Sequence, residues 1–111
     1  MTANAVNEQQ RIEPPRCLIC GDLIRTGVVW FGEQMPVVAW HDAEIAVKQS
    51  DLLIVIGTSG MVYPAATLPR TAINRGIPVI EVNADTTDLK ASFHLRGKAG
   101  TVLPQLVSAA F

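Results

Sequence analysis

The stretch "VIGTSGMVYP", residues Val55–Pro64, joins an aliphatic run to a turn of small residues that is followed by a proline. This order predicts a buried strand, a tight turn and the first turn of a helix. In such a unit, backbone N–H groups and short hydroxyls can face a bound phosphate or ribose. The same residues also suit a plain connection from strand to helix, because Gly-Thr-Ser-Gly matches no phosphate-loop spacing.

The neighbouring segments extend this unit into a larger pattern. Residues 52–56 are apolar at every position, which predicts a strand covered on both faces and central in a parallel sheet. Residues 64–74 predict a helix that ends at Gly76, and Pro69 predicts a kink or a late start. Residues 77–82, "IPVIEV", predict a second strand. The two strands and the helix between them form a βαβ unit, the hallmark of an α/β fold.

The rest of the chain supplies four further elements. Residues 28–31 predict a short strand, and residues 37–50 carry an apolar stripe that predicts an amphipathic helix. Residues 91–95 predict a third short strand of the sheet. Residues 102–107 place their aliphatic side chains on one face of a terminal helix.

Composition limits the classes of function. The chain has 111 residues, of which 49% are hydrophobic and 17% charged, enough for one small core. The net charge of −1 gives no footprint for nucleic acid or an anionic membrane. The start of the chain is polar and no apolar run is long enough to span a bilayer, so we expect a cytoplasmic protein with a small-molecule or protein partner.

The predicted strand ends gather possible ligand contacts. Ligands of open parallel sheets bind beyond the carboxyl ends of the strands, where residues 57–59, Asn83 and residues 97–99 are expected to converge. Asn83 could offer its side chain to a ribose, although asparagine after a strand is also an ordinary turn residue.

Two cysteines form the motif Cys17-Leu18-Ile19-Cys20-Gly21. Such a turn can direct two thiolates at one metal ion, with glycine relieving the backbone. The pair could equally be a redox couple or two inert thiols. A closed zinc site needs four protein ligands, and the chain contains only 2 cysteines.

Four segments together resemble the C-terminal half of the sirtuins, the NAD-dependent protein lysine deacylases. They are "CLICGDLIRTGVVWFGEQMP", "DLLIVIGTSGMVYPAATLP", "IPVIEVN" and "RGKAGTVLPQLV", in this order. The resemblance covers about residues 15–108. The "VYPAA" and "NADTTD" runs are most similar to the branch that includes desuccinylases and bacterial deacylases.

The resemblance implies a partial Rossmann-like, doubly wound parallel sheet with a remnant of a zinc module. Residues 1–15 would be a flexible arm, and residues 16–111 a partial catalytic domain. Within that domain, residues 16–27 would be half of the zinc module and residues 28–111 the Rossmann-like portion.

Site residues carry over from the resemblance position by position. Contacts to the adenosine side of NAD are implied for Gly57, Thr58, Ser59, Asn83, Ala84, Asp85 and Ala99. The acyl-lysine peptide would lie as an added strand along Val29, Phe31, Gly32 and Glu33. Cys17 and Cys20 would be the second half of a four-cysteine zinc site. Without the resemblance, residues 28–31 would be read as a plain core strand with Trp30 and Phe31 as core fillers.

Several motifs of the family are not found in this sequence. It has no Gly-Ala-Gly-x-Ser turn for the NAD phosphates, no Gln-Asn-x-Asp segment and no histidine at the catalytic position, because neither His41 nor His94 matches it. General-base assistance of this kind is worth about 10²- to 10⁴-fold in rate. We therefore assign no catalytic residue and expect a truncated sirtuin that alone lacks useful NAD binding and deacylase activity.

This reading also bears on partners. The family would transfer the acyl group of lysine to ADP-ribose. The chain would be poorly stable as a monomer, and it would need a complementing N-terminal half or would self-associate. The alternatives are a non-catalytic protein-interaction module and a small metal or thiol protein built on Cys17 and Cys20.

Overall fold

The computed structural model describes residues 12–111, so most of the predicted arm lies outside the described residues. The chain divides into two compact units, Met1–Gln34 and Met35–Phe111. The second unit holds every helix and strand of the described residues, and none of these helices is long and apolar enough to cross a membrane. In order they are α1 (Val37–Gln49), β1 (Leu53–Ile56), α2 (Thr67–Asn74), β2 (Val79–Asn83), β3 (Phe93–Arg96) and α3 (Ala99–Ala110).

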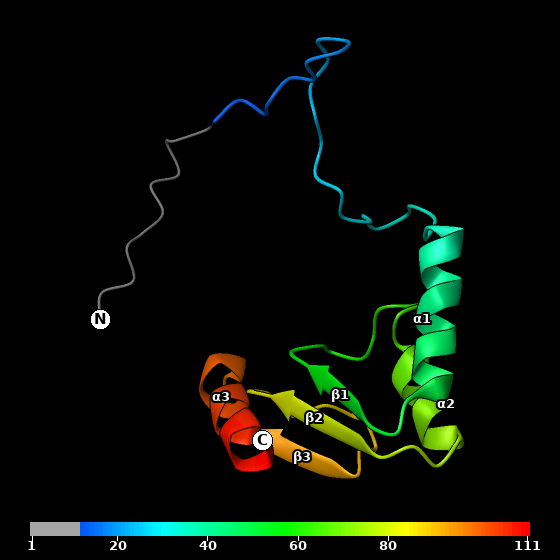
Figure 1. Cartoon of the computed structure of the whole chain (residues 1–111), viewed down its shortest axis with the longest axis vertical. Coiled ribbons are helices and arrows are strands. Elements are labelled where there is room, and N and C mark those ends of the chain that lie inside the picture. Colours follow the sequence, from blue (N-terminus) through cyan, green and yellow to red (C-terminus); the bar gives the residue numbers. More distant parts are fainter. Residues whose placement is uncertain (1–11) are drawn as a thin grey trace. The chain divides into compact units, whose positions relative to one another are not determined.

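The three strands form one parallel sheet in the order β1-β2-β3 (Figure 1). Leu53 pairs with Val79, and Ile80 pairs with Phe93. Helix α2 connects β1 to the parallel strand β2, which confirms the predicted βαβ unit. The architecture is therefore α/β and partly Rossmann-like, as predicted.

Helix α2 begins later than Pro64, as its second proline predicts. It starts at Thr67, which places Pro69 in the first turn, where backbone N–H groups have no partner within the helix. At the other end, Gly76 has a φ of 74°, and its N–H donates to the carbonyl of Ile73 at 3.0 Å. The N–H of Ile77 reaches the carbonyl of Ala72 at 2.9 Å. These two bonds form a Schellman motif, which turns the chain into β2.

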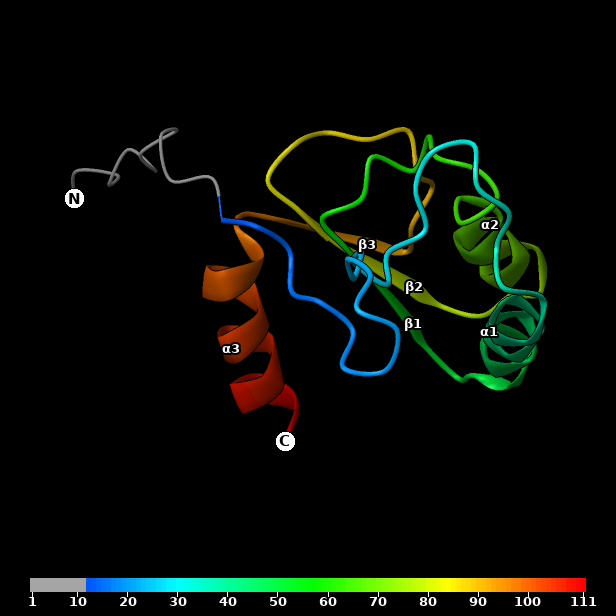
Figure 2. The ribbon, with the colours of Figure 1, turned by 90° about the horizontal axis from the view of Figure 1, so that it is seen from above.

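The core lies between the sheet and the helices α1 and α2. Val47 of α1, Val55 of β1, Ala72 of α2 and Val79 of β2 form one buried cluster. Val82 is also fully buried but points to the other face of β2, because side chains alternate along a strand. Helix α3 contacts β2 and lies across the strands from α1 and α2 (Figure 2).

Strand β1 differs from its prediction as a central, fully covered strand. Among the described residues it pairs with β2 alone and is an edge strand. Ile54 and Ile56 are 40% and 45% exposed, whereas Val55 on the opposite face is buried. An apolar run shows that both faces of a strand can be buried, but burial also needs covering elements, and the described residues cover one face of β1.

The predicted strand at residues 28–31 is wrong. This segment has no regular secondary structure, and Val28, Trp30 and Phe31 are more than half exposed. A strand needs a partner for its backbone groups. Here the side chains of Arg25 and Glu33 take that part, by bonding the carbonyl of Val28 and the N–H of Trp30.

Candidate functional site

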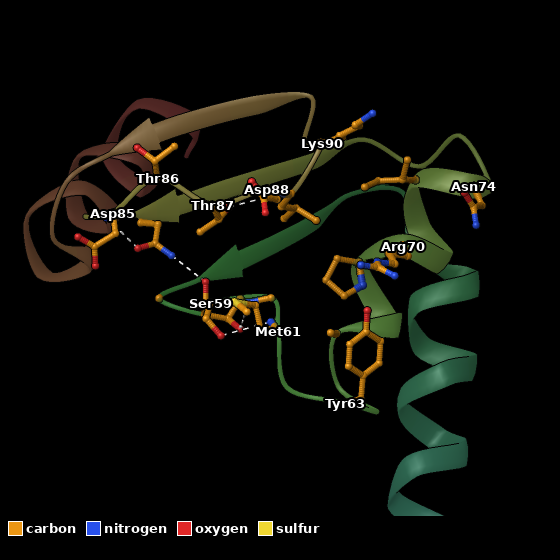
Figure 3. Close-up of a pocket in the computed structure, with 18 residues that line it drawn as sticks. Ser59, Met61, Tyr63, Arg70, Asn74, Asp85, Thr86, Thr87, Asp88 and Lys90 are labelled. Atoms are coloured by element: carbon orange, nitrogen blue, oxygen red, sulfur yellow. Dashed lines mark hydrogen bonds between the residues drawn. The ribbon is translucent and has the colours of Figure 1, made fainter.

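A pocket of about 870 Å³ opens at the carboxyl ends of β1 and β2 (Figure 3). Its walls are the turn after β1, residues 69–74 of α2 and the loop from Asn83 to Lys90. Pockets of this size suit small-molecule ligands. Five of the residues predicted to meet a nucleotide line it, namely Gly57, Thr58, Ser59, Asn83 and Asp85.

Gly57 sets the direction of the turn after β1. Its N–H donates to the carbonyl of Val82 at 2.9 Å, which continues the sheet ladder by one residue. Its φ of 65° lies in the left-handed region, which a β-branched side chain rarely adopts. A Cβ built at this position would have no heavy atom within 4 Å, so the space beside the backbone is open to a ligand.

Two hydroxyls in this turn are held by backbone N–H groups. The N–H of Gly60 donates to Oγ1 of Thr58 at 3.1 Å, and the N–H of Met61 donates to Oγ of Ser59 at 3.3 Å. Each hydroxyl oxygen acts here as an acceptor and keeps its own O–H for donation. Both residues line the pocket, so their O–H groups can donate to the oxygens of a ribose or phosphate bound there.

Asn83 braces the two loops that enclose the pocket. Its Nδ2 donates to the carbonyl of Thr58 at 2.8 Å, and its Oδ1 accepts the N–H of Asp85 at 3.0 Å. The amide therefore shapes the site through Thr58 and Asp85 as well as lining it. Asparagine suits this role because one side chain carries both a donor and an acceptor.

Sequence reasoning predicted Asp85 but missed the other charged side chains of the pocket. Arg70 of α2 and Lys90 line the pocket together with Asp85 and Asp88 (Figure 3). The guanidinium of Arg70 lies 5.5 Å from the ring centre of Tyr63, a cation–π contact. A cation in the first turns of a helix that starts at the strand ends was the available signal for Arg70.

The loop after β2 is anchored on a buried carboxylate. Glu81 is 3% exposed in the middle of β2, and its Oε1 lies 2.9 Å from Nδ1 of His94 on the neighbouring strand. The hydroxyl of Thr87 donates to the other oxygen, Oε2. This contact draws residues 84–90 over the sheet and fixes one wall of the pocket.

Two predicted nucleotide contacts do not line this pocket. Ala84 lies in the bend after Asn83, and Ala99 is the first residue of α3. The third strand end does reach the same edge of the sheet, because the N–H of Gly97 donates to the carbonyl of Asn83 at 3.0 Å. Roles for Ala84 and Ala99 remain predictions.

The predicted peptide-binding residues lie in the other unit, in an irregular segment. Val29 is 36% exposed and Phe31 91% exposed, and Gly32 turns the chain with a φ of 83°. Arg25 forms a two-point ion pair with Glu33, with Nη2 and Oε2 at 3.0 Å. Hydrogen bonds from Arg25 and from the N–H of Trp30 lower the pKa of Glu33 to about 2.

The two cysteines share one tight turn. The N–H of Gly21 donates to the carbonyl of Cys17 at 2.9 Å, and the bridge between Arg16 and Leu23 closes the turn. Backbone N–H donation from Cys20 and Ile19 lowers the pKa of the Cys17 thiol. Within residues 12–111 no group of three or more His, Cys, Asp or Glu side chains could hold a metal ion. Two thiols are half of the ligand set of a tetrahedral zinc site, so the pair does not by itself fit a closed one, and zinc binding remains a prediction.

Comparison with known proteins identifies the family. The sequence model of the Sir2 family matches residues 1–64. The chain is 46% identical over 100 residues to NAD-dependent protein deacylase 2 of Corynebacterium efficiens, and 49% identical over 100 residues to NAD-dependent protein deacylase Sir2 of Mycolicibacterium smegmatis. Each alignment covers 88% of this chain, but 39% and 41% of the relative. The chain therefore belongs to the Sir2 family and spans about two-fifths of the length of these relatives.

Solved structures agree with the fold. A Sir2 homologue in complex with NAD matches 86% of this chain at 47% identity and a TM-score of 0.76, over 38% of its own length. Sir2Tm bound to a propionylated peptide matches 86% of the chain at 31% identity and a TM-score of 0.73, over 41% of its own length. The sirtuin resemblance read from the four sequence segments is confirmed.

Proposed function

We propose that this chain carries the adenosine pocket and the acyl-peptide edge of an NAD-dependent protein-lysine deacylase, which transfers the acyl group from lysine to ADP-ribose. The observation that carries the proposal is the pair of held hydroxyls, Thr58 and Ser59, in a pocket at the strand ends. The deacylase names of the relatives support the reaction class. A cytoplasmic location and a preference within the desuccinylase and bacterial deacylase branch remain predictions.

The residues of the pocket suit the adenosine side of NAD. The O–H groups of Thr58 and Ser59 can donate to ribose oxygens, and the carboxylate of Asp85 can accept from a ribose hydroxyl. Arg70 brings positive charge to the same pocket, where it can attract a phosphate. NAD supplies the ribose that receives the acyl group, while these side chains would bind the adenosine end of the same molecule.

The acyl-lysine peptide is assigned to the segment around Val29 and Phe31. Peptides that add to an exposed backbone edge gain affinity from main-chain hydrogen bonds. Such binding tolerates the Thr26 and Gly27 of this sequence, because their side chains are not the source of affinity.

A general base for deacylation is not assigned to this chain. His94 is paired with Glu81, and His41 is exposed on α1, so neither histidine lines the pocket. We expect the chain alone to bind adenosine weakly and to release no acyl group. An N-terminal half supplied in trans would restore NAD-dependent release.

A titration with adenosine and ADP-ribose, followed by backbone amide NMR, tests the pocket. The amides of residues 57–61 and 83–85 should shift with millimolar ligand. Ser59→Ala should weaken binding about threefold to tenfold, the effect of one net hydrogen bond. Ser108→Ala, at an exposed position of α3, is the matched control and should bind as the wild type does. Shifts scattered away from the strand ends would refute the pocket.

A second candidate is a non-catalytic protein-interaction module. The half-exposed Ile54 and Ile56 on the edge strand β1 favour it, because uncovered strand edges pair with other chains. Sedimentation of the chain with and without adenosine and an acyl-lysine peptide separates the two functions. Association that no ligand alters would favour the module.

A further inference from the structure

Arg25 and Glu33 form a clasp around the segment between them. The guanidinium of Arg25 meets both carboxylate oxygens of Glu33, and its Nη2 also donates to the carbonyl of Val28 at 3.1 Å. Oε2 of Glu33 accepts the N–H of Trp30 at 2.9 Å. The guanidinium also lies 4.6 Å from the ring centre of Trp30. One ion pair thus fixes two backbone groups and one aromatic ring.

The clasp satisfies the backbone on one side of the segment. It engages the carbonyl of Val28 and the N–H of Trp30, which are the groups of alternate residues. Bonding of alternate residues from one side is the pattern of an extended backbone, in which the residue between them directs its groups to the opposite edge. That residue is Val29. Within residues 12–111, neither the N–H nor the C=O of Val29 has a hydrogen-bond partner.

We propose that Arg25 and Glu33 are positioning residues for the acyl-lysine peptide, which hold Val28 and Trp30 from one side so that Val29 presents both backbone groups to the incoming strand. This inference rests on the proposed function. It changes the role of Glu33, which the sequence resemblance placed among the peptide contacts. Both oxygens of its carboxylate are engaged by Arg25, and one of them also by the N–H of Trp30, so Glu33 acts on the peptide through the backbone of residues 28–30.

The chemistry of the pair suits a permanent clasp. Hydrogen bonds from Arg25 and Trp30 keep the pKa of Glu33 at about 2, and the bond to Glu33 raises the pKa of Arg25. Both groups therefore stay charged throughout the neutral range. Exposed ion pairs contribute little to global stability, so the value of this pair lies in local geometry. A planar guanidinium is required, because an ammonium cannot meet two carboxylate oxygens in a fork.

The peptide that fits this edge is recognised mainly through its backbone. Val29 offers one donor and one acceptor, which are the groups of one residue in a sheet ladder. Such an edge suits an extended segment around an acyl-lysine, with little demand on the side chains beside it.

Calorimetric titration of the full chain with an acetyl-lysine peptide tests the clasp. Arg25→Gln should weaken binding about tenfold. The affinity of Arg25→Lys should lie between those of the wild type and Arg25→Gln, because lysine keeps the charge but cannot form the two-point contact. The matched control Arg75→Gln removes an exposed arginine at the C-terminus of α2 and should bind as the wild type does. A peptide with N-methylated amides beside the acyl-lysine should bind the wild type and Arg25→Gln equally weakly.

Amide hydrogen exchange gives a second measurement that needs no ligand. The Trp30 N–H should exchange at least several times faster in Arg25→Gln than in the wild type and in Arg75→Gln. Equal peptide affinity of wild type and Arg25→Gln would overturn the clasp and leave the proposed function standing. A wild type that binds no acyl-lysine peptide, yet loses Trp30 protection in Arg25→Gln, would overturn the peptide-binding function and the positioning role with it.

Discussion

The strand-end pocket and the segment of residues 25–33 differ in how their backbone hydrogen-bonding groups are paired. Around the pocket, backbone groups are paired in a sheet ladder above a core in which Val79 and Ala72 are fully buried. In residues 25–33, side chains of opposite charge pair the backbone instead, and Trp30 and Phe31 stay exposed. The comparison shows that a ladder ties geometry to the whole core, whereas a clasp of side chains can fix a short segment without one.

A substitution in the core of the α/β unit should have the largest effect on stability, and it tests the difference between the two regions most directly. Val79→Asp would place a carboxylate at a fully buried position of β2, at a cost of several kcal/mol, because the one buried charged side chain among residues 12–111 is Glu81, which carries the same charge. We expect loss of the cooperative unfolding transition and of most helical circular dichroism. Arg25→Gln, which disturbs the clasp alone, should leave that transition unchanged. A Val79→Asp variant with a normal transition would show that the core is elsewhere.

The turn after β1 gives the next largest effect. Gly57→Val forces a β-branched residue to a φ of 65°, at a cost of about 1–3 kcal/mol, and fills the open space beside the turn. Asn83→Ala removes two internal hydrogen bonds, worth about 0.5–1.5 kcal/mol each. We expect adenosine affinity, measured by amide NMR, to fall further in Gly57→Val. Equal losses would mean that Asn83 controls the loops as strongly as the glycine does.

The cysteine turn belongs to the unit in which none of the described residues is part of the buried core, and a metal ion would be its most direct support. Two thiolates are half of a tetrahedral set, so we expect the separated monomer to keep less than one zinc ion per chain after chelation and dialysis. A dimer that shares two pairs would retain zinc, which gel filtration with elemental analysis distinguishes. One tightly held zinc per monomer would contradict the prediction.

The sequence predicted the regular unit well because its signals are local. The apolar runs at β1 and β2, the late start of α2 that Pro69 predicts, and Gly76 after the helix each have a direct structural meaning and were confirmed, whereas Pro64 lies before the helix and not in its first turn. Burial of β1 on both faces was wrong, since it depends on elements outside the strand. In the site, the hydroxyls of Thr58 and Ser59 followed from the turn motif. Arg70 and Lys90 were not predicted: the place of Arg70 in the first turns of α2 was its one signal, and a charged residue in a loop, such as Lys90, carries no signal of what it lines.

The segment of residues 25–33 was harder to predict for a physical reason. Residues 28–31 have the β-branched and aromatic composition of a strand, and a strand is what the pattern indicates. The structure instead pairs their backbone with Arg25 and Glu33, which are eight residues apart. A clasp between two such positions has no periodicity, so only coordinates reveal it.

Lowering the pH should produce the smallest effect, and it distinguishes loss of the clasp from unfolding of the α/β unit. The pKa of Glu33 is about 2 in the folded chain and near 4.5 when unperturbed, so the clasp contributes fully above the higher value and is lost as pH falls from about 4.5 to about 2. We expect Trp30 amide protection to be constant from neutral pH to about pH 5 and to decline below it. Glu33→Gln, which carries no carboxylate, should show low protection without this decline. Circular dichroism recorded in parallel reports the ladder of the α/β unit. A Trp30 profile that follows the circular dichroism in both proteins would show that acid unfolds the chain as a whole and that the clasp has no titration of its own.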